Sequence, residues 1–365
     1  MRITLLSKAL VNGAYRRKCE LMAAHRDVEL TVLVPSSWCT DGTTVHLEHQ
    51  HTESYTLREL PIRFNGNFHL HHYPTLAREL KRARPQIFHV DEEPYNLATF
   101  LAYRDSRAQQ PKTLFFTWQN LRREYPPPFR WMERYVFKAS QRAIAGSQEA
   151  AQVLRMKGFA RQIEVIPQFG VDPDVFTPKP VRHDGFVIGY AGRLVYEKGV
   201  DLLLQALRDL PVQACLMIIG SGRELASLRS FAEANKITKR VRFMPTVSTI
   251  QMPALYAQLD AFVLPSRTQP NWKEQFGRVL IEAMACGVPV VGSTCGEIPQ
   301  VIGEAGLLFP EGDMVALRHQ LAQLIEQPHL CADLAQLGRS RVLAHYTMQH
   351  IAEDTVTVYR KMMEV

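Results

Sequence analysis

Short runs of β-branched and apolar residues alternate with amphipathic helical stretches along the 365-residue chain. In the first half we predict strands at 3–6, 28–34, 87–90, 113–117 and 142–145, with an early helix at 13–24. The rhythm restarts in the second half, with strands at 186–191, 214–219, 241–244, 261–264 and 288–291 and a helix at 201–208. Such alternation is typical of βαβ units and parallel sheets. The sequence therefore predicts an α/β protein with two doubly wound, Rossmann-like domains.

Two stretches interrupt this alternation. Residues 40–75 are rich in His, Thr and Asn, and we expect them to be irregular. Four prolines between 167 and 180 predict a stiff linker, which separates an N-terminal domain, 1–170, from a C-terminal domain, 171–345. Ligands of doubly wound sheets bind beyond the carboxyl ends of the strands. With two such domains, the expected site is a central cleft that both domains face.

The composition is that of an ordinary globular protein. Apolar residues make up 46% and charged residues 22%, which excludes a disordered, collagenous or small disulfide-stapled chain. The net charge of +7 suits anionic small substrates or an anionic membrane surface. The six cysteines include no CxxC pair. The first apolar run is too short for a signal peptide, and no uncharged apolar stretch is long enough for a membrane-spanning helix. We therefore expect a cytoplasmic protein with reduced thiols.

The segment from Gly192 to Gly199, GRLVYEKG, directly follows a predicted strand and precedes a predicted helix. Its glycines allow tight turns, and Arg193 and Lys198 place two cations at the edge of the sheet where ligands sit. Arginine offers a planar fork for phosphate oxygens, and lysine offers a mobile point charge. The alternative is a solvated loop with two surface cations.

Two carboxylates, Glu274 and Glu282, lie eight residues apart. Glu282 falls inside the apolar run 279–284, where an unpaired charge is costly, and a buried helix is predicted to start near Phe276. At the helical rise per residue the two carboxylates are about 12 Å apart, roughly the span from a ribose to a sugar across a diphosphate. The free N–H groups of a helix N-terminus favour an anion between them. The alternative is a helix cap plus an ion-paired core glutamate.

Together the two motifs resemble those of the retaining nucleotide-sugar glycosyltransferases of family 4, which have the GT-B fold. The family's GRL-x-x-EKG segment is intact at 192–199, and its E-x7-E motif falls on Glu274 and Glu282. The resemblance covers 165–345 strongly and the first half loosely. It implies a nucleotide-sugar donor domain at 171–345, an acceptor-side domain at 1–170, and a helix at 346–365 that returns to the acceptor side.

The resemblance also implies roles for individual residues. Arg193 and Lys198 would hold the donor diphosphate and stabilise the leaving group, Glu274 would contact the transferred sugar, and Glu282 would bind the ribose hydroxyls. The other donor-binding positions are Gly192 and the backbone of Gln275, Phe276 and Gly277. No metal and no cofactor is expected, since the nucleoside-diphosphate sugar is a substrate. Two cations and a helix N-terminus suffice to neutralise a departing diphosphate.

The first half departs from the family pattern in two loops. The glycine-rich loop after the first strand is reduced to Asn12 and Gly13, which either bring backbone N–H groups to a phosphate or simply start a helix. Where many family members carry a histidine, this chain has Trp118, followed by Gln119 and Asn120, which are candidates for binding acceptor hydroxyls. Asp91, in the run Asp91-Glu92-Glu93, is a further acceptor-side candidate; the alternative is a solvated acidic turn.

Two clusters of side chains stand outside these motifs. Histidines gather at positions 46, 49, 51, 69, 71 and 72, where a metal site competes with the simpler interpretation of surface loops. Residues 76–142 hold 13 Lys and Arg against 7 Asp and Glu. Positions 130, 134, 138 and 142 would form one cationic stripe on a helix, near Trp131. The stripe indicates either a surface that docks on an anionic membrane or a solvated helix face. Nucleic-acid binding is disfavoured, because no recognition motif accompanies the charge.

The leading hypothesis is a metal-independent, retaining glycosyltransferase that moves a sugar from a nucleoside diphosphate to a hydroxyl of a glycan or lipid-linked acceptor. It would act in polysaccharide or cell-envelope glycan biosynthesis. The alternatives are a soluble sugar synthase with a sucrose-like or glycogen-like product, and a non-catalytic nucleotide-sugar-binding protein. A nicotinamide dehydrogenase is disfavoured, because no third glycine follows Gly220-Ser221-Gly222 at the required spacing.

Overall fold

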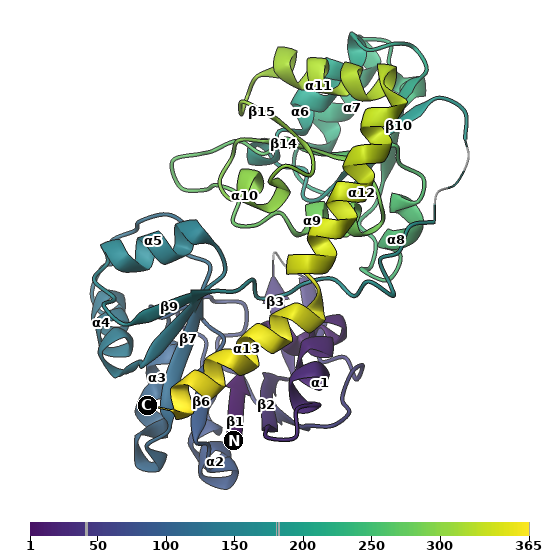
Figure 1. Ribbon diagram of the computed structural model, residues 1–365. Coiled ribbons are helices and arrows are strands. Elements are labelled where there is room, and N and C mark those ends of the chain that lie inside the picture. The colour runs from purple at the N-terminus through teal and green to yellow at the C-terminus, as the bar shows by residue number, and fades with distance from the viewer. Residues whose placement is uncertain (41–42, 180, 182, 365) are drawn as a thin grey trace. The chain divides into compact units, whose positions relative to one another are not determined.

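The computed structural model describes residues 1–40, 43–179, 181 and 183–364. The chain divides into two compact units (Figure 1). The N-terminal unit consists of Met1–Phe169 and the segment that begins at Met348, and the C-terminal unit is Gly170–Thr347. Each unit is built around its own parallel sheet with helices on both faces. This is the doubly wound α/β architecture that the alternating sequence pattern predicts.

The sheet of the N-terminal unit has its two earliest strands away from the edges. Its strands are parallel and run in the order β5 (Thr56–Leu60), β2 (Glu29–Pro35), β1 (Arg2–Leu6), β6 (Ile87–Val90), β7 (Lys112–Thr117), β8 (Arg142–Ala145) and β9 (Gln162–Val165). From β1 the chain moves outward first to β2 on one side and later to β6 on the other. The strand order therefore reverses between β1 and β6, where loops diverge and ligands of such folds bind.

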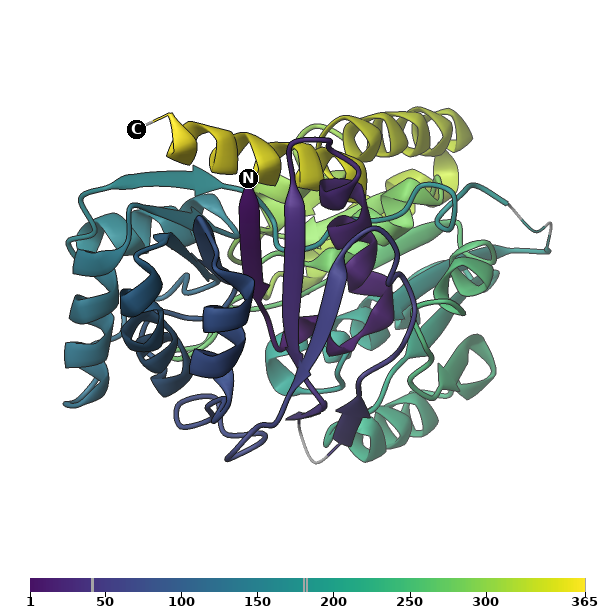
Figure 2. The ribbon, with the colours of Figure 1, turned by 90° about the horizontal axis from the view of Figure 1, so that it is seen from below.

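Helix α13 (Met348–Met363) completes the N-terminal unit from the far end of the chain (Figures 1 and 2). It packs against α1 (Arg17–Ala23) and buries Ile351, Val358 and Met362 in the same core as strand β1. The Tyr359 hydroxyl lies 2.8 Å from Nδ1 of the buried His89. The remaining helices are α2 (Leu76–Ala83), α3 (Leu97–Ser106), α4 (Phe129–Ala139) and α5 (Gln148–Met156).

The prediction of irregular structure for 40–75 is wrong in part. Strand β5 pairs in parallel with β2, and β4 (Thr43–His46) forms an antiparallel pair with β3 (Ser37–Thr40). Only Leu60 of β5 is buried, so this edge strand carries little of the apolar alternation on which sequence prediction depends. The early helix also differs, because Gly13–Arg16 forms a 3-10 turn and α1 begins at Arg17.

The sheet of the C-terminal unit is likewise parallel. Its order is β12 (Val241–Met244), β11 (Ala214–Ile219), β10 (Phe186–Ala191), β13 (Ala261–Leu264), β14 (Val290–Ser293) and β15 (Leu307–Phe309). Its helices are α6 (Val200–Arg208), α7 (Leu225–Ala234), α8 (Met252–Tyr256), α9 (Arg278–Ala285), α10 (Ile298–Ile302), α11 (Met314–Glu326) and α12 (Pro328–His345). Four predicted strands match β10 to β13, whereas β14 begins two residues later than predicted. The order reverses between β10 and β13.

The proline-rich segment is packed against the unit on each side of the boundary. Gln168 donates to the Asp91 carboxylate, and the Phe169 ring stacks on Tyr15 with 4.1 Å between centroids. Phe176 is 4% exposed in the C-terminal unit. The boundary between the two units, between Phe169 and Gly170, falls within this predicted linker. Pro180 lies outside the described part of the chain. None of the helices in the described part is both long and apolar enough to cross a membrane.

Candidate active site

A cavity of about 260 Å³ opens at the carboxyl edge of the C-terminal sheet. Gly192 and Arg193 line it from the loop after β10, Gly220 and Ser221 from the loop after β11, and Glu282 from α9. The two loops approach each other closely, because a Cβ on Gly220 would lie 1.9 Å from the Gly192 carbonyl oxygen and Gly220 has φ +150°. Only glycine permits this approach. The Tyr190 hydroxyl fixes the loop further by donating to the Arg193 carbonyl, 2.8 Å away.

Lys198 is held against Glu274. Its ammonium lies 2.6 Å from Oε2 of Glu274 and 5.0 Å from the centroid of the Trp272 ring. The Ser266 hydroxyl also donates to Oε2 of Glu274, at 2.9 Å. Ser266 comes just after β13, and Lys198 follows β10. The segments after the two strands at the reversal of the sheet order therefore both contact this carboxylate. The arrangement places a lysine beside a nearly buried glutamate. This agrees with the expectation that both loops lie at the carboxyl edge of the sheet.

Glu282 is buried on α9 with two hydrogen-bond donors. The Tyr256 hydroxyl donates to Oε2 at 2.9 Å, and Nε of Arg278 lies 3.0 Å from Oε1. Burial raises the pKa of Glu282, although the Arg278 charge and both hydrogen bonds oppose the rise. The sequence identified Glu282 but missed both partners. Arg278 lies four residues before Glu282, a spacing that places two side chains on one helix face, so it could have been found. Nothing in the sequence pointed to Tyr256.

Helix α9 begins at Arg278, two residues after the predicted start. Gly277 is its N-cap with φ +81°, and residues 274–277 are not helical. The estimate of 12 Å between the two carboxylates therefore does not hold, because the helical rise applies only from Arg278 onward. Gln275, Phe276 and Gly277 precede the first turn, whose N–H groups have no partner within the helix.

In the N-terminal unit, Asp91 lies at the reversal of the strand order. It follows β6, and its Oδ2 accepts from the Ser7 hydroxyl, after β1, at 2.7 Å and from Nε2 of Gln168 at 2.9 Å. Asp91 is 3% exposed, and its Oδ1 has no hydrogen-bond partner among the described residues. A buried carboxylate oxygen without a donor is costly, and such atoms mark places where a ligand or water binds.

Glu92 and Glu93 are also enclosed, so the alternative of a solvated acidic turn is wrong. Glu92 forms an ion pair with Lys8 and accepts from the Tyr73 hydroxyl at 3.0 Å. Burial would raise its pKa, but Lys8 and His71 outweigh that effect and bring the pKa to about 2. Burial raises the pKa of Glu93 to about 6, against hydrogen bonds from the Thr117 hydroxyl and the Trp118 N–H.

The remaining residues predicted for the N-terminal unit have their polar groups engaged within the unit. Asn12 accepts from the Ala14 N–H at 3.0 Å, and the Gly13 N–H donates to Oε2 of Glu48 at 2.6 Å. The Gln119 side chain contacts the Tyr125 hydroxyl and the Lys157 ammonium, and the Asn120 amide donates to Glu149. All of these partners belong to the N-terminal unit.

The histidine group separates into different environments. His71 is buried beside Glu92, whereas the His69 ring packs against Tyr95, Tyr125 and Phe129. Among the described residues, no three His, Cys, Asp or Glu side chains converge as metal ligands would.

The predicted cationic stripe is shorter than the sequence spacing indicated. Helix α4 carries Arg130, Arg134 and Lys138 on exposed positions but ends at Ala139. Arg142 lies on β8, where its guanidinium lies 3.0 Å from Glu164, so including it in the stripe was wrong. The strand that follows α4 breaks the four-residue spacing.

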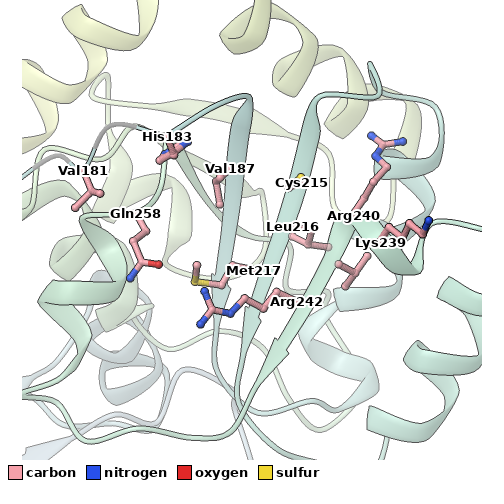
Figure 3. Close-up of a pocket in the computed structure, with 11 residues that line it drawn as sticks. Val181, His183, Val187, Cys215, Leu216, Met217, Lys239, Arg240, Arg242 and Gln258 are labelled. Carbon is pink, nitrogen blue, oxygen red and sulfur yellow. The ribbon is translucent and has the colours of Figure 1, made fainter.

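Another cavity of the C-terminal unit, of about 440 Å³, lies at the opposite edge of the sheet (Figure 3). Val187, Cys215 and Met217 lie along it, and Gln258 and Arg242 approach Met217 from two sides. Arg193 and Lys198 follow the carboxyl end of β10, whereas this cavity lies against the amino-terminal halves of β10 and β11. It is therefore separate from the candidate active site.

Two family models match the chain. The model described as Glycosyltransferase Family 4 matches residues 18–175, and the model described as Glycosyl transferases group 1 matches residues 172–341. Together they span most of both units.

The similarity to curated relatives extends over only part of each protein. A GDP-mannose-dependent monoacylated alpha-(1-6)-phosphatidylinositol monomannoside mannosyltransferase from Corynebacterium glutamicum is 33% identical over 52% of this chain and 54% of its own length. A D-inositol 3-phosphate glycosyltransferase from Mycolicibacterium smegmatis is 28% identical over 65% of this chain and 57% of its own length. The chain thus spans about half the length of the curated relatives it matches.

Solved structures match over nearly the whole chain. HepE from Anabaena in complex with UDP has a TM-score of 0.77 and 18% identity, covering 99% of this chain and 100% of that one. Sucrose-phosphate synthase from Thermosynechococcus elongatus has a TM-score of 0.74 and 21% identity, covering 99% of each chain. These likenesses establish the fold.

Proposed function

Because the chain belongs to glycosyltransferase family 4 and has the GT-B fold, we propose that it transfers a sugar from a nucleoside-diphosphate sugar to a hydroxyl of a glycan or lipid-linked acceptor. The proposed setting is polysaccharide or cell-envelope glycan biosynthesis. The observation that carries the proposal is the cavity at the carboxyl edge of the C-terminal sheet, with Arg193 and Glu282 in its wall and the Lys198–Glu274 pair in the loops beside β10 and β13.

On this proposal, each donor-side residue has a distinct task. Arg193 and Lys198 neutralise the charge that develops on the departing diphosphate, and the first turn of α9 adds the positive end of its dipole. Glu282, oriented by Tyr256 and Arg278, accepts hydrogen bonds from the ribose hydroxyls. Glu274 contacts the transferred sugar and orients Lys198. The residues thus supply charge stabilisation, and we assign no protein nucleophile.

Asp91 is the acceptor-side group that the geometry supports best. Its Oδ2 is anchored by Ser7 and Gln168, which leaves Oδ1 to accept a hydrogen bond from an incoming hydroxyl. Its position after β6, at the reversal of the strand order, is where doubly wound sheets bind ligands.

The experiment that tests the donor proposal is a thermal-shift screen of the full chain against nucleoside diphosphates and their sugars. A ligand that binds only the folded protein raises its Tm, by an amount that grows with concentration. We expect one nucleotide class to raise the Tm and the Arg193→Ala variant to lose that shift. A matched control is Arg208→Ala, which removes an exposed arginine paired with Asp209 at the C-terminal end of α6, outside the cavity lining. The proposal is overturned when no nucleotide shifts the Tm of the wild-type chain.

We also propose that the N-terminal unit docks reversibly on anionic membranes, where a lipid-linked acceptor would be found. Helix α4 carries Arg130, Arg134 and Lys138 on its exposed face, and the Trp131 ring is 62% exposed beside them. Cations with an exposed tryptophan suit the headgroup region of an anionic bilayer. The name of the Corynebacterium relative, whose acceptor is a phosphatidylinositol mannoside, supports the same class of acceptor.

Co-sedimentation with anionic vesicles tests this docking. Changing Arg130, Arg134 and Lys138 to Glu should abolish binding that the wild-type chain shows. The control changes Arg208, Arg229 and Lys236, exposed cations of the C-terminal unit, to Glu. Docking through α4 is refuted if both triple variants bind equally well.

A further inference from the structure

A cavity of about 580 Å³ lies at the amino edge of the N-terminal sheet, opposite the edge that carries Asp91. Arg2 opens β1, Lys112 opens β7, and Lys81 and Arg84 come from the end of α2. The first strand and the last turn of α13 reach this same end of the unit, where Met363 lines the cavity (Figures 1 and 2). Neither the proposed transfer reaction nor the proposed membrane contact uses this cavity.

Four cations line the cavity, and the described residues in its wall include no Asp or Glu. In the described part of the chain, none of the four forms an ion pair with a carboxylate. Like charges gathered without a counter-ion repel one another and destabilise the fold. Three of these cations, Lys81, Arg84 and Lys112, belong to the basic surplus of 76–142 that the sequence shows.

Two of the cationic groups are held in place by the backbone. Nε of Arg2 donates to the Arg84 carbonyl at 3.1 Å, and the Lys112 ammonium donates to the Met362 carbonyl at 2.6 Å. The Arg2 N–H donates to the Gln86 side chain at 2.9 Å, which ties the start of β1 to the segment before β6. The side chains of Arg2 and Lys112 are thus arranged before any ligand arrives, which reduces the entropy lost on binding.

From this geometry we infer a second ligand site, for a small molecule that carries two or more phosphate groups. The cavity is larger than one phosphate needs, and exposed single charges contribute little each, so an effective ligand must engage several cations at once. Arginine forks match phosphate oxygens in particular. The amides of Gln109 and Gln110 and the apolar surface of Pro85 and Met363 can contact an organic part of the ligand.

Tripolyphosphate is the probe, titrated calorimetrically into the full chain. The protein carries Arg193→Ala and Lys198→Ala, so that the proposed donor site contributes no phosphate binding. We expect binding to persist in this background, and adding Lys81→Glu and Arg84→Glu to weaken it at least about 10-fold. The control, Arg78→Glu with Arg82→Glu, makes the same change in net charge on the same helix, outside the cavity lining, and should weaken binding less than about 3-fold.

Three results overturn the inference. They are absence of binding, equal weakening by the control pair, and binding only to vesicles that contain a polyphosphorylated lipid, which would assign the site to a headgroup. Where charge reversal prevents folding, Lys81→Gln with Arg84→Asn removes the charges instead. Asparagine tolerates the left-handed conformation of Arg84, which has φ +46°. The titration measures neither nucleotide-sugar binding nor sugar transfer. A negative result therefore overturns this inference alone and does not bear on the proposed function.

Discussion

The carboxyl edges of the two sheets share one architecture and differ in what fills them. In the C-terminal unit, glycine-rich loops leave a cavity of about 260 Å³ at the reversal of strand order, with Arg193 and Glu282 in its wall. In the N-terminal unit, the equivalent point is filled by three acidic residues and their partners, of which Asp91 is anchored by Ser7 and Gln168. The first edge presents positive charge to an open space, and the second encloses negative charge.

The difference shows that strand order fixes where a site can form, while loop composition decides which ligand it takes. A phosphate needs backbone approach and cations, the role proposed for the loops of Gly220 and Arg193 that line this cavity. A sugar hydroxyl needs a fixed acceptor, the role proposed for Asp91, whose buried Oδ1 has no hydrogen-bond partner among the described residues. The Asn12–Gly13 loop of the N-terminal unit illustrates the contrast, because its Gly13 N–H is already bound by the Glu48 carboxylate.

The largest expected effect is at the C-terminal edge. Arg193→Ala or Lys198→Ala should lower kcat for sugar transfer by about 10²- to 10³-fold, the usual loss when one preorganised charge at a developing anion is removed. Steady-state kinetics with the nucleotide sugar found by thermal shift measures this, with Arg208→Ala as the control. Near wild-type turnover in both variants would refute the diphosphate assignment.

The N-terminal edge should behave differently. Asp91→Asn keeps the anchors from Ser7 and Gln168 but removes the charge, and should lower transfer to the acceptor by about 10- to 100-fold. Nucleotide affinity and donor hydrolysis without acceptor should stay unchanged. Asp105→Asn, at a partly buried aspartate of α3 paired with Arg104, is the matched control. Equal loss of hydrolysis and transfer would remove the distinction between the two edges.

Glu93 makes the stability of the N-terminal unit depend on pH. Its folded pKa of about 6 lies above the ordinary value of 4.5, so the folded state holds the proton more tightly than the unfolded state. The free energy of unfolding therefore falls as the pH rises from about 4.5 to 6. Glu93→Gln cannot ionise and should be more stable than wild type by about 2 kcal/mol at pH 7.5, with no gain at pH 4.

Denaturant unfolding followed by tryptophan fluorescence measures this, since Trp38, Trp118 and Trp131 lie in the N-terminal unit. Glu59→Gln, at an exposed position of β5, should show no such pH dependence. If the free energies of unfolding of wild type and Glu93→Gln differ by the same amount at every pH, the raised pKa of Glu93 is contradicted.

The smallest expected effect concerns the orientation of Glu282. Tyr256→Phe removes one of the two donors to this buried carboxylate and should weaken nucleotide binding about fivefold, or about 1 kcal/mol. Tyr103→Phe is the control, because it removes a buried hydroxyl that bonds to Ser140 in the N-terminal unit. Tyr103→Phe should lower Tm without changing nucleotide affinity. If Tyr103→Phe weakens nucleotide binding as much as Tyr256→Phe does, Tyr256 acts only through the stability of the fold.

Sequence prediction succeeded where the residue pattern is the physical cause of the structure. Strands such as β10 and β11 are buried runs of apolar residues, and their bounds were predicted without error. It failed for β5, whose exposed edge leaves the apolar pattern weak, and for the helical stripe, since nothing in the four-residue spacing signals that α4 stops at Ala139. Motif resemblance and local chemistry also singled out Arg193, Lys198, Glu274 and Glu282, whose roles in the site stay predictions.

The partners of those residues come from elsewhere in the chain. Tyr256 lies 26 residues before Glu282, Ser266 comes from the loop after β13, and Gln168 reaches Asp91 from 77 positions away. The sequence by itself determined the alternating fold, the two units and the charged motifs, because these depend on local periodicity and residue type. Only the tertiary structure decided which donors face which carboxylates and which cations share a cavity, because parallel sheets place distant strand ends side by side.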